Sequence, residues 1–384
     1  MSAVIESNLS HISQKTQKEA MKILHVITSL ATGGAEHLMV DLLPRLRDKG
    51  NNVELLVFDG TDTPFMRQLL DAGIVVHRLG IGGNVYNPMH IVRLTRFVRR
   101  YDVIHTHNTA CQLFAPLARL LTFGGAKLVT TEHSTTNRRR GKWYFKPVDR
   151  WMYARYSAIV AISEKAEALL RSYVHPKHLI TIENGINVDR YATASAARRA
   201  ELVPGYTDGD VVIVMVAAFR SPKDQDCAIR AMSELPENYK LCLVGDGVRR
   251  TEIEALVASL GLQHRVRMPG IRSDVPQILK AADVNVLASH FEGLSLSSVE
   301  GMAAGRPFVA SDVDGLREVV QGNGILFAEG NHRQLAEILL RLINNRDEYE
   351  KVARACADAA TNYDIALMVE RYHQVYNELC QERR

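Results

Sequence analysis

The stretch MKILHVITSLATGGAEHLMVDLLPRLRDKG, residues 21–50, sets the architecture that we expect for the rest of the chain. Its first ten residues are rich in β-branched and apolar side chains, as in a buried strand. A loop with two adjacent glycines follows, and then a helix that ends at Gly50. A strand that leads through a turn into a helix begins a βαβ unit, which predicts a parallel sheet.

The same alternation of short strands and helices runs through the chain in two series. In the first half the further strand candidates are NNVELLVF, DAGIVVHRL, YDVIHTH, KLVTTEH, SAIVAIS and KHLITIENGI. After a polar stretch broken by Pro204 and Gly205 they are DVVIVMVAAF, YKLCLVGDG, HRVRMPG, ADVNVLAS, RPFVASD and NGILFA. We therefore predict an α/β protein with two Rossmann-like, doubly wound parallel-sheet domains that face a cleft. Ligands bind such sheets at the carboxyl ends of their strands.

The expected divisions follow from this alternation. They are a flexible leader over 1–20, an N-terminal domain over 21–190, a linker over 191–208, a C-terminal domain over 209–362 and a C-terminal helix over 363–384.

Composition excludes several classes of protein. The 384 residues are 46% hydrophobic and 23% charged, as in soluble globular proteins. No apolar run approaches the roughly 18–20 residues of a membrane span, and the N-terminus has no apolar signal core. Five cysteines without a CxxC pair favour reduced thiols in a cytoplasmic protein over a disulfide framework or a structural zinc site. The net charge of +4 does not by itself imply nucleic acid.

Gly33 and Gly34 follow the first strand and open the next helix. Glycines there let a backbone approach a ligand closely, and free helix N–H groups favour anions. An ordinary tight turn explains the pair equally well. Because the pattern is not GxGxxG, a dinucleotide-binding fold of the dehydrogenase kind is not supported.

Histidines end two further strands. His105 and His107 end DVIHTHN, and His133 ends LVTTEHS. One histidine at a strand end is usually a hydrogen-bonded structural residue, but several on one predicted rim are equally consistent with a ligand site. Zinc is less attractive, because no close Cys, Asp or Glu set accompanies them.

The second half places cations and glycines at strand ends. Arg220 and Lys223 follow a buried strand, and two cations there suit a diphosphate better than they suit a helix N-terminus. The alternative is a solvated helix start. Gly245 in LVGDG and Arg272 in PGIR repeat the strand-end theme, so we count both as candidates for nucleotide binding.

The stretch HFEGLSLSSVE, residues 290–300, carries Glu292 and Glu300 eight residues apart. Ser297 followed by Glu300 fits a capping box, in which hydroxyl and carboxylate satisfy helix N–H groups without any ligand. This structural interpretation and a ligand-binding role are both open from the residues alone.

These motifs, in this order and spacing, resemble the retaining glycosyltransferases of the GT-B fold, in the family-four group. The resemblance runs from about residue 21 to 340. Its strongest element is SHFEGLSLSSVEGMAAGRPFVA (289–310), which matches an E-x7-E pattern followed by a helix and strand. The supporting matches are GGAE (33–36), TEHS (131–134), ISE (162–164), ENGIN (183–187), FRSPKD (219–224) and LVGDG (243–247).

The resemblance implies roles for the residues of the E-x7-E block. Glu300 would bind the donor ribose, and Glu292 would lie against the donor hexose. The backbone N–H groups of Ser295 and Leu296 would face the diphosphate. The capping box and the binding role are then compatible. The family often has glycine where Ser295 stands.

Further roles carry over outside this block. Arg220 and Lys223 would hold the diphosphate, with Gly34 on its other side, and His133 and His107 would lie by the transferred sugar or the acceptor. The family commonly places its arginine five residues before the lysine, and that position here is Ala218.

The implied reaction is hexosyl transfer with retention at the anomeric carbon, by front-face attack in which the leaving diphosphate accepts the acceptor's proton. The cations and the helix N-terminus would stabilise the leaving group, so we expect no cofactor and no metal. UDP is favoured as the nucleotide by family frequency. The alternatives are a GDP-mannose-dependent mannosyltransferase, a non-hydrolysing nucleotide-sugar epimerase and a catalytically silent binding subunit.

The acceptor expected from the resemblance is a glycan or lipid-linked saccharide of bacterial surface polysaccharide synthesis, such as capsule or O-antigen. The segment NRRRGKWYFKPVDRWMYAR (137–155) holds seven cations and one acid, with aromatic residues between them. This composition suits anionic lipid headgroups, or a solvated helix with buried aromatics. A second basic patch is RLTRFVRR (93–100). We expect a cytoplasmic protein with peripheral contact to the inner face of the membrane and no nucleic-acid partner.

Overall fold

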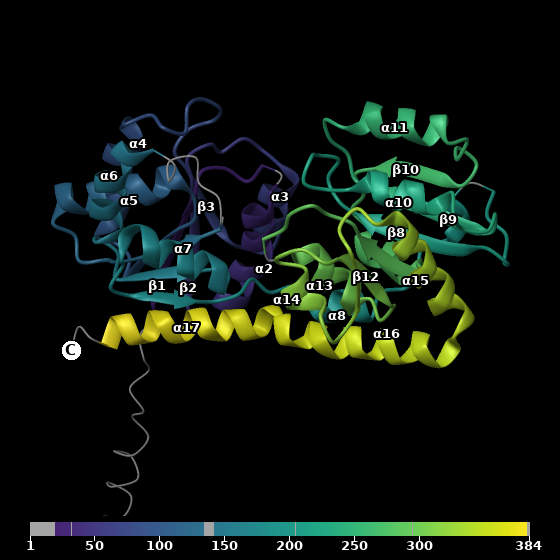
Figure 1. Cartoon of the computed structure of the whole chain (residues 1–384). Helices are drawn as coiled ribbons and strands as arrows, with labels where there is room; N and C mark the ends of the chain where they lie inside the picture. The colour runs from purple at the N-terminus through teal and green to yellow at the C-terminus, as the bar shows by residue number, and fades with distance from the viewer. Residues whose placement is uncertain (1–19, 32, 134–141, 204, 294, 382–384) are drawn as a thin grey trace, which may run out of the picture.

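The computed structural model describes residues 20–31, 33–133, 142–203, 205–293 and 295–381. It contains two parallel sheets, each in its own α/β domain. Figure 1 shows the N-terminal domain, purple to teal, beside the mainly green C-terminal domain. The prediction of two doubly wound domains is confirmed. The expected leader, apart from Ala20, lies outside the described residues.

The N-terminal sheet has seven strands in the order β3-β2-β1-β4-β5-β6-β7. Their bounds are β1 Lys22–Ile27, β2 Asn52–Val57, β3 Val75–Arg78, β4 Val103–Thr106, β5 Lys127–Glu132, β6 Ala158–Ala161 and β7 Leu179–Thr181. The helices are α2 Gly34–Asp48, α3 Pro64–Asp71, α4 Met89–Val98, α5 Thr109–Thr122, α6 Lys146–Tyr153 and α7 Glu164–Val174, with a 3-10 turn, η1, at Trp143–Phe145. Five of the six residues of β1 are fully buried, because helices cover both faces of the sheet.

The C-terminal sheet has six strands in the order β10-β9-β8-β11-β12-β13. Their bounds are β8 Val211–Val216, β9 Tyr239–Val244, β10 Val266–Gly270, β11 Val284–Leu287, β12 Phe308–Ser311 and β13 Ile325–Phe327. The helices are α10 Gln225–Met232, α11 Arg250–Ser259, α12 Val275–Ala281, α13 Leu296–Ala303, α14 Arg317–Val320, α15 His332–Asn344 and α16 Arg346–Ala360, and the 3-10 turn η2 spans Thr361–Tyr363.

The segment expected as a linker is folded. It contains part of α8, Val188–Ala192, and all of α9, Arg199–Leu202. Leu202 and Val203 are fully buried in the core of the C-terminal domain. The prediction of a linker was based on the polar composition of this stretch, but its few apolar side chains pack into the core of the C-terminal domain and give it a defined structure.

The chain crosses between the domains twice at one place. The Ile186 N–H donates to the Tyr363 carbonyl at 2.9 Å, and the Ile365 N–H donates to the Ile186 carbonyl at 2.8 Å. A Cβ on Gly185 would lie 2.7 Å from the Ile365 Cα, so only glycine allows the two segments to approach this closely. After this crossing α17, Ile365–Gln381, packs into the N-terminal core through its buried side chains, and Figure 1 shows it beneath that domain.

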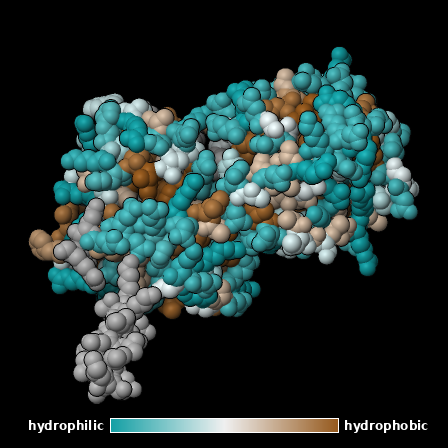
Figure 2. All heavy atoms as spheres, turned by 90° about the horizontal axis from the view of Figure 1, so that it is seen from below, coloured by the Kyte–Doolittle hydropathy of each residue, from teal (hydrophilic) through white to brown (hydrophobic). Residues whose placement is uncertain are grey.

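Among the described helices, none combines the length and the hydropathy that a membrane span requires. The face seen from below is mostly hydrophilic, with apolar side chains in scattered groups (Figure 2).

Candidate active site

The carboxyl ends of three C-terminal strands surround a cavity of about 670 Å³, and the glycine turn after β1 reaches it from the other domain. It is lined by Gly33, Val216, Ala217, Ala218, Phe219, Arg220, Lys223, Val244, Gly245, Asp246, Gly247, Val248, Ile271, Arg272, Val275 and Ser297. This cavity therefore brings together five of the residues proposed from the sequence: Gly33, Arg220, Lys223, Gly245 and Arg272.

Glycines shape one wall of the cavity. Gly245 has a φ of +141°, and a Cβ there would lie 2.1 Å from the Ala217 carbonyl oxygen. A Cβ on Gly247 would lie 2.3 Å from the Phe219 carbonyl oxygen. The loops after β8 and β9 can pack together only because both positions lack a side chain.

Lys223 and Glu292 form an ion pair at the edge of this cavity, with only 12% and 11% of their side chains exposed. The Lys223 ammonium donates to Glu292 Oε1, and the Ser289 hydroxyl donates to the same oxygen at 2.7 Å. Backbone pairing of Lys223 with Ser289 holds the two loops together. A sugar or phosphate that enters here meets a cation and a carboxylate already fixed in position.

The two arginines of the cavity differ. Arg220 is exposed. Arg272 donates to both oxygens of Asp274, at 2.7 and 2.6 Å, and this bidentate pair lowers the pKa of Asp274. Part of the Arg272 charge is therefore already neutralised, so Arg220 is the better placed of the two for an incoming anion.

The start of α13 corrects the predicted capping box. The helix begins at Leu296 with Ser295 as its N-cap residue, so Ser297 lies inside the first turn. The Ser295 and Ser297 hydroxyls are hydrogen-bonded to each other at 3.1 Å, and Ser295 makes no side-chain cap. Glu300 is hydrogen-bonded to Tyr191 instead of reaching back to the helix start.

Glu300 lies in a small second cavity between the domains. Its lining residues are His37, Leu38, Asp41, Gly185, Ile186, Asn187, Arg190, Tyr191, Leu296 and Glu300. Burial raises the pKa of Glu300 to about 7, while the Tyr191 hydrogen bond and the charge of Arg190 oppose the rise. A partly buried carboxylate with a raised pKa gains most from a ligand that donates hydrogen bonds to it.

Four histidines gather in the N-terminal domain. His107 Nδ1 lies 3.0 Å from His133 Nε2, and His107 Nε2 lies 2.9 Å from His25 Nδ1. His105 bonds the Tyr376 hydroxyl at 2.5 Å and the Thr131 hydroxyl at 2.8 Å. Burial lowers the pKa of His133 to about 4 and that of His25 to about 3, so these rings are neutral at pH 7.

The ring nitrogens of His25, His105 and His107 lie close enough together to hold a metal ion. Both nitrogens of His105 and the facing nitrogens of the other two rings already take part in hydrogen bonds. The group contains no carboxylate or thiolate, and no counter-charge for a dication. We therefore interpret it as a hydrogen-bonded network.

The proposed site residues thus fall into three groups. Glu292 joins the large cavity through Lys223, Glu300 and Leu296 line the small one, and His107 and His133 belong to the histidine network. Gly34 begins α2, directly after the glycine that lines the large cavity. Sequence reasoning missed His25 and Tyr191, which sit inside a strand and inside the expected linker.

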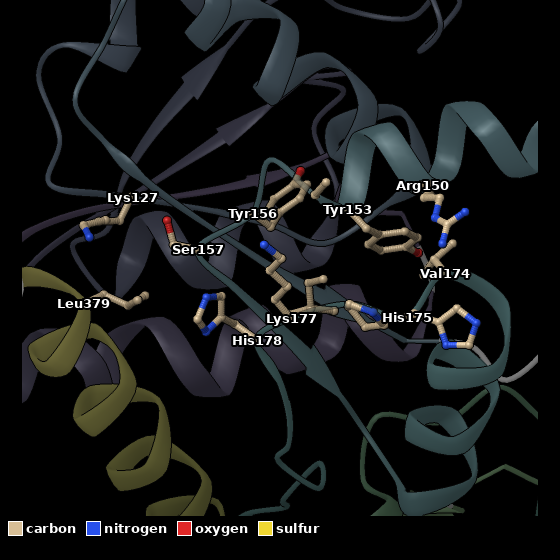
Figure 3. A pocket seen from close by; sticks show the side chains of 13 residues that line it. Lys127, Arg150, Tyr153, Tyr156, Ser157, Val174, His175, Lys177, His178 and Leu379 are labelled. Atoms are coloured by element: carbon tan, nitrogen blue, oxygen red, sulfur yellow. The ribbon is translucent and has the colours of Figure 1, made fainter.

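A further pocket of about 550 Å³ lies away from these groups. It is lined by Lys127, Arg150, Tyr153, Ala154, Tyr156, Ser157, Ile159, Val174, His175, Pro176, Lys177, His178 and Leu379, and Figure 3 shows these side chains. Lys127 begins β5, whereas Ser157 and His178 directly precede β6 and β7. The pocket therefore lies at the amino ends of the strands, opposite the edge where the cavity opens.

Two family models match the chain. The model described as Glycosyl transferases group 1 matches residues 203–360, and the model described as Glycosyltransferase Family 4 matches residues 32–190. The two matches fall on the C-terminal and N-terminal domains respectively, so each domain is recognised on its own.

Individual proteins are similar along most of the chain. The protein EpsD of Bacillus subtilis is 27% identical over 293 residues, which cover 72% of this chain and 76% of that one. The UDP-Gal:alpha-D-GlcNAc-diphosphoundecaprenol alpha-1,3-galactosyltransferase of Escherichia coli is 24% identical over 384 residues, or 95% and 99% of the two chains. The crystal structure of Anabaena HepE in complex with UDP and glucose has a TM-score of 0.79 at 22% identity, over 93% of this chain and 99% of that one.

Proposed function

Because this chain belongs to the group 1 glycosyltransferases of the GT-B fold, we propose that it transfers a hexose from a UDP-linked sugar. The acceptor is a glycan or lipid-linked saccharide of bacterial surface polysaccharide synthesis. One observation carries the proposal: a single cavity joins a glycine turn of one domain to the cations Arg220, Lys223 and Arg272 of the other. Cations at strand ends facing glycine backbone suit a diphosphate.

In the proposed complex the diphosphate lies against Arg220, Lys223 and the start of α13, and accepts from the N–H groups of Ser295 and Leu296. Gly33 and Gly34 approach it from the N-terminal domain. The cavity geometry supports this placement, because Gly33 and Ser297 line the same space as the two cations.

The rest of the donor occupies the neighbouring groups. Glu300 accepts hydrogen bonds from the ribose hydroxyls, which the ionised carboxylate can receive in pairs. Glu292 faces the hexose, and its ion pair with Lys223 holds the Glu292 carboxylate in place. His133 and His107 lie on the side of the acceptor or the transferred sugar, and Gly245 and Arg272 complete the nucleotide side of the cavity.

The reaction proposed is transfer with retention and without a metal. The acceptor hydroxyl attacks the anomeric carbon on the face from which the diphosphate departs, and its proton passes to that diphosphate. The protein's contribution is to stabilise negative charge on the leaving group through Lys223, Arg220 and the start of α13. Three preorganised positive groups take the place of a divalent cation in this scheme.

The choice of UDP rests on two similar proteins. The Escherichia coli relative is named for UDP-Gal, and the Anabaena structure holds UDP and glucose. The test is an assay of UDP or GDP release from UDP-galactose, UDP-glucose and GDP-mannose, with the wild type and Lys223→Met side by side. UDP release that depends on Lys223 supports the proposal. Release of GDP alone moves the donor to GDP-mannose, and release from none of the three refutes the assignment.

Peripheral contact with an anionic membrane is part of the proposal. Residues 137–141 lie outside the described residues, but the rest of the segment exposes Trp143 by 86% and Tyr144 by 51%. Lys142 and Lys146 flank these rings, and α6 lends Arg150 to the basic pocket of Figure 3. Exposed aromatics among cations are typical of proteins that bind the headgroup region.

Flotation with vesicles tests this contact. We expect the protein to float with phosphatidylglycerol vesicles at low salt and to remain below with phosphatidylcholine vesicles. Trp143→Ala with Tyr144→Ala should reduce flotation, whereas Leu367→Ser, at a 49% exposed position on α17, should not. Equal flotation of both variants, or none by the wild type, contradicts a contact through this segment.

A further inference from the structure

Three imidazoles of the N-terminal domain form a continuous hydrogen-bonded row. It runs from His25 through His107 to His133, with nitrogen–nitrogen distances of 2.9 and 3.0 Å. His25 lies inside β1 and is fully buried, whereas His133 directly follows the carboxyl end of β5. The row therefore leads from the interior of the sheet to the edge where ligands bind.

Both ends of the row are unpaired. Among the residues that the structure describes, neither His25 Nε2 nor His133 Nδ1 has a hydrogen-bond partner, and both atoms are buried. For His133 this open nitrogen is the one at the cleft end, beyond the two bonds of the row. An unpaired buried polar atom at a substrate edge indicates a partner supplied by a ligand.

The number of protons limits the row to two arrangements. Each neutral imidazole carries one N–H, and a bond between two ring nitrogens needs one proton. Three protons serve two bonds, so the third sits at one end. Either His133 Nδ1 carries it and His25 Nε2 is bare, or His25 Nε2 carries it and His133 Nδ1 is bare. Any other arrangement makes two lone pairs or two N–H groups face each other.

The interior end decides between these arrangements. In the second one an N–H group of His25 would be buried without an acceptor, which native proteins rarely tolerate. In the first the unpaired N–H belongs to His133, which follows the carboxyl end of β5, where a substrate oxygen can accept from it, and the interior atom is a bare nitrogen. We propose that His25 and His107 are positioning residues that fix His133 as the Nδ1–H tautomer, so that His133 presents a hydrogen-bond donor to a substrate hydroxyl oxygen.

This assignment excludes a role for His133 as general base. Its Nε2 accepts the hydrogen bond from His107, and its Nδ1 already carries a proton. The inference rests on the proposed function, and it agrees with a reaction in which the leaving diphosphate receives the acceptor's proton. The substrate oxygen to which His133 donates belongs to the transferred sugar or to the acceptor saccharide.

Neighbouring rings hold the row in place. His105 stacks on His107 with 4.3 Å between ring centroids, and both of its own nitrogens are engaged by Tyr376 and Thr131. The Tyr372 hydroxyl also bonds Thr131, at 2.9 Å. Two tyrosines of α17 thus pack against His105, and His107 cannot turn without breaking its stack on that ring.

The direct test is the tautomeric state of the protein alone, without any sugar. Protonated and bare imidazole nitrogens have well-separated ¹⁵N chemical shifts, and long-range ¹⁵N–¹H spectra of histidine-labelled protein tell them apart. Single His→Asn variants assign the resonances. We expect His25, His107 and His133 to be protonated at Nδ1 at pH 7. Protonation at Nε2 in all three overturns the proposal, and would mean that His25 donates into the core, for example to the ring of Tyr376.

Matched substitutions test the consequence for catalysis. The amide nitrogen of Asn occupies the place of Nδ1, and that of Gln the place of Nε2. His133→Asn should therefore stay within about tenfold of the wild-type kcat, and His133→Gln should lose about 10²-fold, as expected for removal of one catalytic donor. Equal losses in the two variants contradict a donor at Nδ1.

A second pair tests His25 through the tautomer itself. His25→Asn keeps a donor toward His107 and should leave the Nδ1–H signal of His133 in place. His25→Leu removes that donor and should give His133 a mixture of tautomers, with a lower kcat at nearly constant KM. A single unchanged tautomer in His25→Leu removes His25 from the proposal. If the tautomers are as expected and no sugar is transferred, the proposed function is wrong, but the direction of the hydrogen bonds from His25 through His107 to His133 is confirmed.

Discussion

Binding of UDP is expected to weaken as the pH falls through 7, because the carboxyl group that receives the ribose is itself protonated there. Burial in the small cavity raises the pKa of Glu300 to about 7, against the opposing effects of Tyr191 and Arg190. Only the ionised carboxylate accepts hydrogen bonds from both ribose hydroxyls. Nucleotide binding must therefore release a proton from Glu300 whenever the pH is near or below 7.

The size of the effect follows from this pKa. Between pH 8 and pH 6 the ionised fraction of a group with a pKa of about 7 falls about tenfold, which corresponds to about 1.4 kcal/mol of binding free energy. Calorimetry in buffers of different ionisation enthalpy should show release of about half a proton per UDP at pH 7.

Glu300→Gln is the control. UDP has its own ionisation in this range, so the relevant quantity is the difference between the wild type and this variant. The variant should bind UDP more weakly at pH 8 and should lack the Glu300 part of the pH dependence. Identical pH profiles for the two proteins would refute the assignment of the ribose to Glu300.

The same pKa has a consequence for stability without ligand. A carboxyl group whose pKa is raised by folding stabilises the fold at low pH, and this contribution is lost as the pH rises from about 4.5 to about 7. The difference amounts to about 3 kcal/mol. The glutamine side chain of Glu300→Gln does not titrate. As the pH rises through this window, the melting temperature of the variant should therefore increase relative to that of the wild type. A constant difference in melting temperature from pH 5 to pH 8 would show that Glu300 is not held dry.

Three further predictions concern the large cavity. Lys223→Met should lower kcat by about 10²-fold or more, since it removes a charge that stabilises the leaving group and leaves Glu292 without its partner cation; a change in KM alone would indicate uniform binding. Gly245→Ala should cost about 2 kcal/mol or more and weaken nucleotide binding, because its Cβ would lie 2.1 Å from the Ala217 oxygen at a φ of +141°. Gly209→Ala, which has open space around its Cβ, should be close to neutral in thermal unfolding. Sugar transfer should persist in excess EDTA, and activity that vanished with chelator and returned with manganese would contradict charge stabilisation by the protein alone.

The two sheets were predictable from the sequence because their strands are buried on both faces. A continuous apolar run such as VVIVMV (211–216) has no polar face to expose to water, so it indicates a strand that is covered on both sides. The glycines and cations that follow such strands lie at the carboxyl edge of the sheet, because all strands of a parallel sheet end at the same edge. The cavity that joins Gly33, Arg220 and Lys223 follows from this geometry. The E-x7-E spacing likewise drew attention to Glu292 and Glu300 before any contact was known.

The contacts across strands and domains were not predictable. His25 pairs in register with His105 because β1 lies beside β4 in the sheet. The order of strands in a sheet cannot be predicted from the residue pattern of each strand. Tyr191 reaches Glu300 from a stretch whose composition indicates a linker. The capping box failed because the N-cap of α13 is Ser295, two residues before Ser297, at a junction where three serines offer equivalent starts and tertiary packing selects one.

Binding of a nucleoside diphosphate in the cavity between the domains can be measured by thermal unfolding with UDP, GDP and NAD, each at millimolar concentration and without metal. A ligand at a hundred times its Kd adds about 2.7 kcal/mol to the free energy of unfolding. We expect a clear rise in melting temperature with UDP, a smaller rise or none with GDP, and loss of the UDP effect in Lys223→Met. Stabilisation by NAD only, or by none of the three, would contradict this binding.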